Sequence, residues 1–364
     1  MLAQYCMTIL GQLFIGRGFM REEKKFKTIS EQLEGLKRKN LMFNGESDEN
    51  FAIDVLEKTN FYTLVNGYKE IFLDVNYQKI NNNDPDERYE KDTFFKDLYF
   101  LYYFDSELRH VFLKFIFMFE SNIKAKIIYY FSEKFYENNN AYLDKNNFNY
   151  TDSFLQSNIE MLIKKMEKII DNQKKLPNTR INHYSQYYSA IPLWVLMPQL
   201  DFGTISHFFK YCTKDIQSKI AKHLKSNFIK NYPEYNNSFI LTSEVLSNML
   251  FFINSFRNIC AHNERLYNHR YYNNNINTTV IHDFYHLKFK YSVFDLILLL
   301  MGFMTPSEYE LFKKLIASPL AFLYCNIGKE RFIKIVQKMK FSRKWEEILK
   351  IKDDFEKFKL IYSN

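Results

Sequence analysis

Apolar residues recur at steps of three and four along most of the chain, which predicts helices rather than strands. The pattern is clearest in residues 242–267, where one helical stripe is apolar: Val245, Leu246, Met249, Leu250, Ile253, Phe256 and Cys260. The opposite stripe is polar but almost uncharged, since Arg257 is the only fixed charge between Glu244 and Glu264. Such a helix is typical of a buried site, and a buried arginine needs an anionic partner. We therefore expect this face to look into a cleft or an interface.

The same periodicity predicts an all-α fold. Helices are expected at residues 28–40, 51–58, 61–72, 92–136, 153–170 and 293–304. The longest is expected to kink near Asp105, and residues 293–304 to form a core helix that is too short to span a bilayer. Pro192 and Pro198 bracket a short helix, and Gly203 with Thr204 begins the next one. Polar segments at 137–151, 171–190 and 268–279 are predicted loops.

A polar stretch at residues 81–90, which contains Pro85, is the candidate domain boundary. It divides a small helical N-terminal lobe, residues 20–90, from a larger helical domain, residues 91–364. Residues 1–19 are expected to be an extension. They resemble the apolar part of a signal peptide but lack a basic start and a small-residue cleavage site, so no secretion is expected.

Composition agrees with a globular protein in a reducing compartment. The 364 residues include only 9 Gly and 7 Pro, few for a fold built on tight turns. The formal net charge of +8 permits nucleic acid as a partner. Four scattered cysteines form neither a metal knuckle nor a disulfide framework, which favours buried thiols in the cytoplasm. We expect a cytoplasmic protein that does not associate with membranes.

The polar face of the central helix carries candidate chemistry. Asn254, Asn258 and His262 follow one another at steps of four, with Arg257 beside them. Two interpretations stay open at this level. The groups form either a hydrogen-bonded structural network or a site in which imidazole moves a proton while guanidinium holds an anion.

The string RNICAHNERLYN, residues 257–268, resembles a known family. Its Arg-x-x-x-x-His core is similar to the signature of HEPN ribonucleases, and the longer string resembles the Abi-like (AbiD/AbiF) abortive-infection family. Further similar positions are Gly67-Tyr68, Asp105 to Arg109, Pro192-x-Trp194 and Phe202-Gly203. The resemblance implies a HEPN-type helical bundle and a metal-independent endoribonuclease that acts in phage defence.

The resemblance also implies roles for individual residues. His262 would be the general acid or base, Arg257 would hold the scissile phosphate, and Asn258 would position either of them. Supporting residues would be Asn254, Asn263 and Glu120, with Glu120 or Asp105 pairing with Arg257. As an alternative, both acids are simply exposed. No cofactor and no metal is implied, and the products would be a 2′,3′-cyclic phosphate and a 5′-hydroxyl.

The resemblance further implies a homodimer, in which two copies place their motifs across a two-fold axis. On an ideal helix, positions five apart point about 140° away from each other. We therefore expect that the helix ends or kinks near Cys260, or that Arg257 reaches around it.

RNA contacts are expected from two basic segments: Lys174, Lys175 and Arg180 in the predicted loop, and Arg265, His269 and Arg270 after the motif. A charge run is also often just a solvated face. His282 and His286 have the spacing with which a helix binds zinc, but the zincin glutamate is replaced by Asp283 and no third ligand follows. No metal site is therefore predicted.

Two other functions remain open. The chain is alternatively a non-catalytic module that binds or senses a small structured RNA. It is otherwise the toxin of a pair with a nucleotidyltransferase antitoxin, in which a Tyr two residues after the motif His is modified; Glu264 stands at that position here. An antitoxin or a phage component would then be a further partner.

Overall fold

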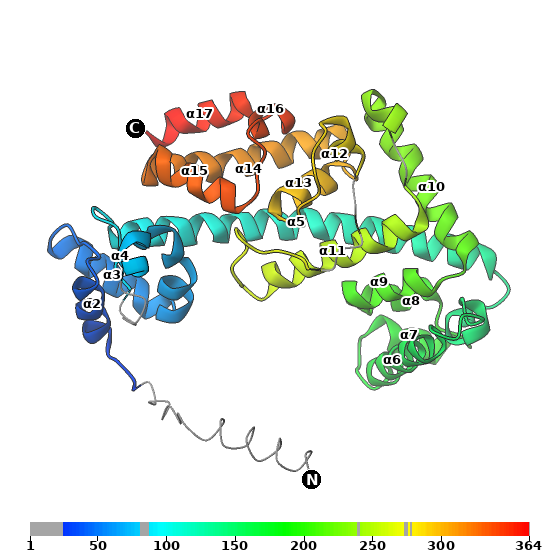
Figure 1. Cartoon of the computed structure of the whole chain (residues 1–364). Coiled ribbons are helices and arrows are strands. Elements are labelled where there is room, and N and C mark those ends of the chain that lie inside the picture. The colour runs from blue at the N-terminus through cyan, green and yellow to red at the C-terminus, as the bar shows by residue number, and fades with distance from the viewer. Residues whose placement is uncertain (1–24, 81–86, 239–240, 273–275, 277–278, 364) are drawn as a thin grey trace, which may run out of the picture. The chain divides into compact units, whose positions relative to one another are not determined.

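The structure is a computed structural model that describes residues 25–80, 87–238, 241–272, 276 and 279–363 (Figure 1). The expected extension at 1–19 lies outside these residues, as does most of the predicted boundary segment. Within the described residues the prediction of an all-α fold is confirmed, since β-pairing is limited to three isolated bridges.

The α-helices are α2 (Ile29–Arg38), α3 (Glu46–Lys58), α4 (Val75–Ile80), α5 (Phe95–Lys134), α6 (Gln156–Lys174), α7 (Arg180–Tyr187), α8 (Leu193–Leu196), α9 (Phe202–Tyr211), α10 (Lys214–Asn231), α11 (Ser243–Ala261), α12 (Val280–Phe284), α13 (Val293–Met301), α14 (Pro306–Ile327), α15 (Lys329–Lys338), α16 (Trp345–Ile348) and α17 (Lys352–Tyr362). Short 3-10 or π turns are η1 (Tyr62–Asn66), η2 (Lys69–Phe72), η3 (Ala141–Leu143), η4 (Lys145–Asn147), η5 (Met197–Gln199) and η6 (Pro233–Ser238).

The chain forms two compact units. Among the described residues, the first consists of 25–61, 72–80 and 87–95, and the second of 62–71 together with 96–363. In the first unit α2 begins at a capping box, in which the Thr28 hydroxyl accepts from Glu31 N–H and the Glu31 carboxylate accepts from Thr28 N–H. The predicted division between residues 90 and 91 remains a prediction.

The second unit is built around α5, which spans 40 residues and passes Asp105 without interruption (Figure 1). One face of α5 buries a row of apolar side chains: Leu101, Phe104, Leu108, Phe112, Phe115, Phe119, Ile123, Ile127 and Phe131. Burial of each such side chain contributes roughly 1.5–3 kcal/mol, so this face anchors the core. The predicted core helix is confirmed as α13, in which every residue is buried. Among the described residues, no helix combines the length and the apolar content that a membrane crossing requires.

The segment predicted as a loop at 171–190 is partly helical. Helix α6 continues to Lys174, and α7 follows because the Thr179 hydroxyl caps its first turn by accepting from Asn182 N–H at 3.0 Å. A loop was predicted because this segment is polar and lacks a strong apolar stripe. Helix α7 packs against α6 and α8, so the turn at residues 175–179 joins two packed helices (Figure 1).

Candidate functional site

Helix α11 carries Arg257 and ends at Ala261, just before His262. Thr242 caps its start, and a left-handed Asn263, with φ 56°, ends it just after Ala261. Glu264 N–H donates to Ile259 O at 3.0 Å and Asn263 N–H to Cys260 O at 3.4 Å, the two bonds of a Schellman motif. The prediction that the helix ends near Cys260 is confirmed. His262 is therefore the C-cap residue and is exposed. Because it lies beyond the last helical residue, the direction of its side chain is not set by the 100° per residue of the helix.

Asp105 holds the segment after the motif through hydrogen bonds to its backbone. The carboxylate of this fully buried residue accepts from Leu266 N–H at 2.9 Å and from Tyr267 N–H at 2.7 Å. The Tyr68 hydroxyl also donates to it, at 2.7 Å. Because these two donors lie four and five residues after His262, Asp105 fixes the path of the chain beyond the motif.

Arg109 completes this buried network. Its Nη1 donates to Asp105 Oδ2 at 2.7 Å and to Glu264 O at 3.3 Å. Burial raises the pKa of the Asp105 carboxyl, and the Arg109 guanidinium and the backbone donors Leu266 and Tyr267 oppose that rise. A buried carboxylate needs this many donors to be tolerated, so the network is a unit in which no member is dispensable.

Arg257 is half-buried and has no acidic partner among the described residues. Its guanidinium lies over the Phe117 ring at 5.9 Å, and its Nε is buried without a hydrogen-bond partner in this part of the chain. The predicted pairing with Glu120 or Asp105 is wrong. Each acid is instead matched by a cation one turn along α5, Glu120 by Lys124 at 2.8 Å and Asp105 by Arg109.

The alternative that both acids are merely exposed is also wrong, since Glu120 is 7 % exposed and Asp105 0 %. Glu120 keeps one buried oxygen, Oε2, without a partner among the described residues. Three charged groups among the described residues thus retain a buried polar atom without a hydrogen-bond partner: Arg257 at Nε, Glu120 at Oε2 and Arg109 at Nη2. Buried polar atoms of this kind are uncommon and often mark the place of a ligand, a water or a second chain.

The amides of the predicted site lie in different surroundings. Asn258 is exposed, whereas Asn254 is half-buried against α9. A Cβ at Gly203 would lie 3.3 Å from Asn254 Nδ2 and 3.2 Å from Asp201 Oδ1, so glycine allows Asn254 to approach the start of α9 closely. Asn263 acts through its backbone, since its left-handed conformation ends α11 and directs the chain toward the Asp105 network.

Polar groups beside Asn254 were not predicted. Asp201 caps α9, and Lys165 donates to its Oδ2 at 2.8 Å and to Thr204 Oγ1 at 2.5 Å. Partial burial acts to raise the pKa of Asp201, but the hydrogen bonds from Lys165 and Thr204 prevail and lower it to about 2. On the same helix His207 contacts Phe251 of α11, with ring centroids 5.0 Å apart. The helix start expected at Gly203 and Thr204 was the sequence signal nearest to this group.

The predicted RNA contacts fall into two separate places (Figure 1). Lys174, Lys175 and Arg180 are exposed at the turn between α6 and α7. The other three are already in use by the protein, because Arg265 donates to Gly67 O at 2.5 Å, Arg270 donates to Lys290 O, and His269 Nε2 lies 3.2 Å from Ser255 Oγ. These three hold the segment after the motif.

His282 has a structural partner. It is fully buried, with Nε2 at 2.8 Å from Asp295 Oδ1 and Nδ1 at 2.6 Å from Thr279 Oγ1. Helix α12 ends at Phe284, so His286 does not lie on the same helix and the helical pair needed for zinc does not form. The described residues contain no group of three His, Cys, Asp or Glu side chains arranged to hold a metal ion.

A family model for Abi-like proteins matches residues 54–268, more than half of the chain. The chain belongs to the Abi-like family. The match contains Tyr68, Asp105, Arg109 and the whole of α11, so the buried network and the motif lie inside the part that defines this Abi-like protein. The family is named for abortive infection, a form of phage defence. The chain matches no curated protein and no solved structure.

Proposed function

We propose that this Abi-like protein is a metal-independent endoribonuclease of the HEPN type and that Arg257 and His262 form its catalytic pair. The observation that carries the proposal is the half-buried Arg257, which keeps a buried Nε without a partner among the described residues. A guanidinium held in this way is suited to a phosphodiester, because a phosphate oxygen accepts from it with little cost in reorganisation.

The chemistry uses the RNA's own 2′-hydroxyl as nucleophile. An imidazole takes the proton from that hydroxyl, and O2′ attacks the adjacent phosphorus. The bond from phosphorus to O5′ then breaks, and the leaving oxygen receives a proton, which yields a 2′,3′-cyclic phosphate and a 5′-hydroxyl. His262 is exposed at the helix end, where it can reach a substrate, and Asn258 stands one turn before it. Arg257 stabilises the charge that develops on the phosphate.

A second copy of the chain would complete the site. Two apolar side chains on α5 lie exposed on the surface, Phe117 at 46 % and Met118 at 38 %, and Arg257 packs on the first of them. A two-fold interface over this surface would bury these side chains and bring two Arg-x-x-x-x-His motifs together. One imidazole would then serve as base and the other as acid.

A non-catalytic RNA-binding module is the second candidate. It is favoured by the exposed cations Lys174, Lys175 and Arg180, which lie away from the motif at the α6–α7 turn. Such a module would bind RNA with a steep dependence on salt but would leave it intact.

The proposal is tested in cells that express the protein and are infected with phage. Arg257→Ala and His262→Ala should each abolish toxicity and protection, since a proton-transfer group contributes a factor of roughly 10² to 10⁴. Arg257→Lys should also fail, because an ammonium lacks the bidentate grip of a guanidinium. Matched controls are His110→Ala and Arg343→Ala, both at exposed positions outside α11. Unchanged toxicity in Arg257→Ala and His262→Ala would refute the proposal.

A further inference from the structure

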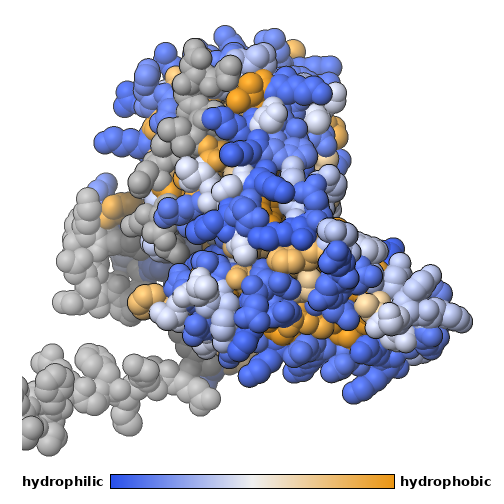
Figure 2. All heavy atoms as spheres, turned by 90° about the vertical axis from the view of Figure 1, so that its right-hand side faces the viewer, coloured by the Kyte–Doolittle hydropathy of each residue, from blue (hydrophilic) through white to orange (hydrophobic). Residues whose placement is uncertain are grey.

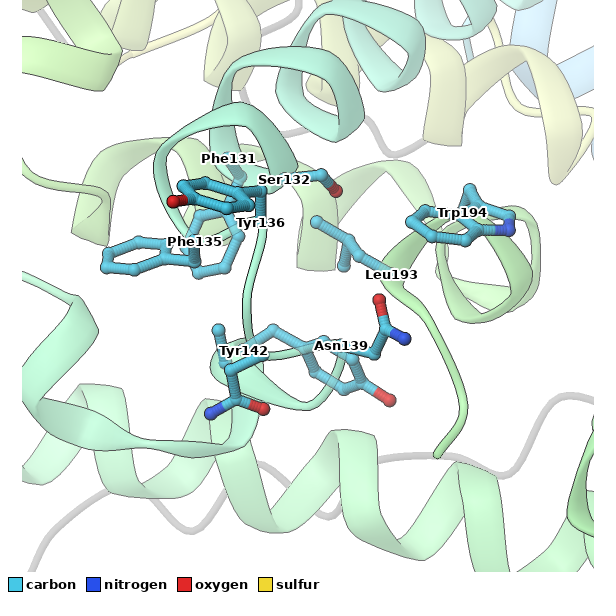
Figure 3. Close-up of a pocket in the computed structure, with 10 residues that line it drawn as sticks. Phe131, Ser132, Phe135, Tyr136, Asn139, Tyr142, Leu193 and Trp194 are labelled. Atoms are coloured by element: carbon cyan, nitrogen blue, oxygen red, sulfur yellow. The ribbon is translucent and has the colours of Figure 1, made fainter. Parts of the chain in front are cut away.

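A cavity opens at the end of α5, on elements other than α11. Its volume is about 200 Å³, and it lies between the last turn of α5, the segment leading to η3, and the first turn of α8. In Figure 3, Leu193 lies in the middle of the group, with Trp194 on one side and Phe135 and Tyr136 on the other. The apolar lining consists mainly of Phe131, Phe135, Tyr136, Tyr142, Leu193 and Trp194.

The cavity is aromatic yet open to solvent. Trp194 is 46 % exposed and Tyr136 77 %, so both rings offer open surface on which a flat ligand can stack. Figure 2 shows an apolar patch bordered by hydrophilic side chains on the side of the molecule that carries α6 to α9. None of the lining residues is charged, so the cavity is not built to hold a free phosphate or carboxylate.

Polar groups at the cavity still have free hydrogen-bonding capacity. Among the described residues, three polar groups of the lining make no hydrogen bond within the protein: the Ser132 hydroxyl, the Asn139 amide and the Trp194 indole N–H. Asn138 uses its Oδ1 to accept from Asn140 N–H at 2.9 Å, which leaves its NH₂ available. A flat ligand in the cavity would therefore meet both donors and acceptors at its edge.

The walls themselves are fixed. The Tyr142 hydroxyl donates to Ile191 O at 2.7 Å, and Asn140 Oδ1 accepts from Ile191 N–H at 3.3 Å. These bonds tie η3 and the residue before it to Ile191, just before α8, so the aromatic walls are held in place before any ligand arrives. A preformed site costs less ordering on binding.

We infer that this cavity binds one unstacked base of a single-stranded RNA. A nucleobase is planar, uncharged and edged with donors and acceptors, which matches an aromatic wall flanked by amides and a hydroxyl. The exposed cations at the α6–α7 turn, Lys175 and Arg180, supply contacts for the neighbouring phosphates. Helix α7 packs against α8, which carries Trp194, so both features belong to one group of packed helices.

The inference rests on the proposed function in one respect, namely that RNA is the ligand of this protein. It adds that the RNA is single-stranded where it is held and that a base is read far along the chain from the catalytic motif. Helix α8 leads through η5 into α9, and α9 packs on α11 at Gly203 and Asn254. The cavity is thus linked to α11 through α8, η5 and α9, so an RNA held in the cavity would lie on the same group of connected helices as the motif.

The experiment uses the intrinsic fluorescence of the full chain. The only tryptophans are Trp194 and Trp345, and Trp345 is 7 % exposed among Phe332, Phe341 and Phe355. His262→Ala serves as the background, so that RNA is not cut during the titration. Single-stranded oligoribonucleotides should quench the fluorescence, also after Trp345→Phe, whereas blunt duplex RNA of equal charge should quench it far less.

Affinity is measured in parallel by anisotropy of labelled single-stranded RNA. Trp194→Ala should weaken binding about 5- to 150-fold, the range expected for loss of one base stacked on an aromatic ring. Trp194→Phe should recover most of the affinity. Asn139→Asp changes an exposed side chain and should also weaken binding, because a donor is lost and a negative charge is gained. Trp345→Phe is the matched control and should leave affinity unchanged.

The outcomes separate this inference from the nuclease proposal. If the wild type never cuts RNA but single strands quench Trp194, the cavity is a base site and the nuclease proposal fails. If RNA is cut with a KM that Trp194→Ala and Asn139→Asp leave unchanged, the nuclease proposal stands and the base site is refuted. Equal quenching by duplex RNA, or an apolar dye that fills the cavity and is not displaced by single strands, would likewise overturn the inference.

Discussion

Asp105 and Tyr267 stand 162 positions apart in the chain, yet the carboxylate of the first accepts the backbone N–H of the second at 2.7 Å. This bond joins the first third of the long helix α5 to the segment that follows the motif. It makes the path of the chain beyond His262 depend on a buried acid that does not itself face a substrate.

Asp105→Asn should therefore disturb the segment after His262, although Asp105 is not itself part of the catalytic pair. The amide keeps the size of the carboxyl but leaves Arg109 buried without its counter-charge, and breaking such a pair costs about 3–5 kcal/mol. Thermal unfolding should show the loss, and amide hydrogen exchange should rise in residues 264–270 first. Glu107→Gln on the exposed side of α5 is the control and should change stability by less than about 0.5 kcal/mol. Unaltered exchange in the segment would contradict the role given to Asp105.

The sequence predicted part of this arrangement. The end of helix α11 near Cys260 followed from the angle between Arg257 and His262 on an ideal helix. The hydrogen-bond partners of Asp105 could not be predicted from the sequence. Periodicity shows which face of a helix is buried, but not which residues distant in the sequence pack against that face. Glu120 was assigned to Arg257 although Lys124, one turn away, already neutralises it.

Phe117→Glu should give a monomer if α5 and α11 form the interface between two copies. A carboxylate at the centre of an apolar contact is costly to bury, and it would also draw the guanidinium of Arg257 away from a substrate. Light scattering should report a dimer for the wild type. Phe154→Glu changes a residue that is 89 % exposed and should leave the dimer intact. A wild type that is monomeric at micromolar concentration would rule the interface out.

The segment after the motif should loosen in acid. Burial lowers the pKa of His269 below its ordinary value of 6.5, while the Glu264 carboxylate opposes this shift. Between the two pKa values the unfolded chain binds more protons, so stability is complete above about pH 6.5 and is lost as the pH falls below it. His269→Gln should flatten this step in unfolding experiments at pH 5 to 8. His207 and His223 titrate in the same direction, so the difference between wild type and variant is the quantity to compare.

Two glycines should respond differently to alanine. Gly35 lies within α2 with no neighbouring atom within 4 Å of an added Cβ, so Gly35→Ala should stabilise the protein by about 0.5–1 kcal/mol. At Gly203 the same helix-forming gain is offset by the approach of Asn254 and Asp201, so Gly203→Ala should bring no gain, and Gly203→Val a clear loss. Chemical denaturation measures all three variants. An equal gain at both positions would show that Asn254 moves away freely.

Cleavage of RNA by the purified protein is the most direct test of the Arg257–His262 pair. Wild type is incubated with single-stranded RNA in the presence of a chelator, beside His262→Ala and the control His110→Ala, and the new ends are mapped. We expect 2′,3′-cyclic phosphate and 5′-hydroxyl ends from wild type and from the control. His262→Ala should lose a factor of roughly 10² to 10⁴ in rate with its helical content unchanged. Cleavage that persists in a folded His262→Ala protein, or that the chelator abolishes in the wild type, would contradict the proposed mechanism.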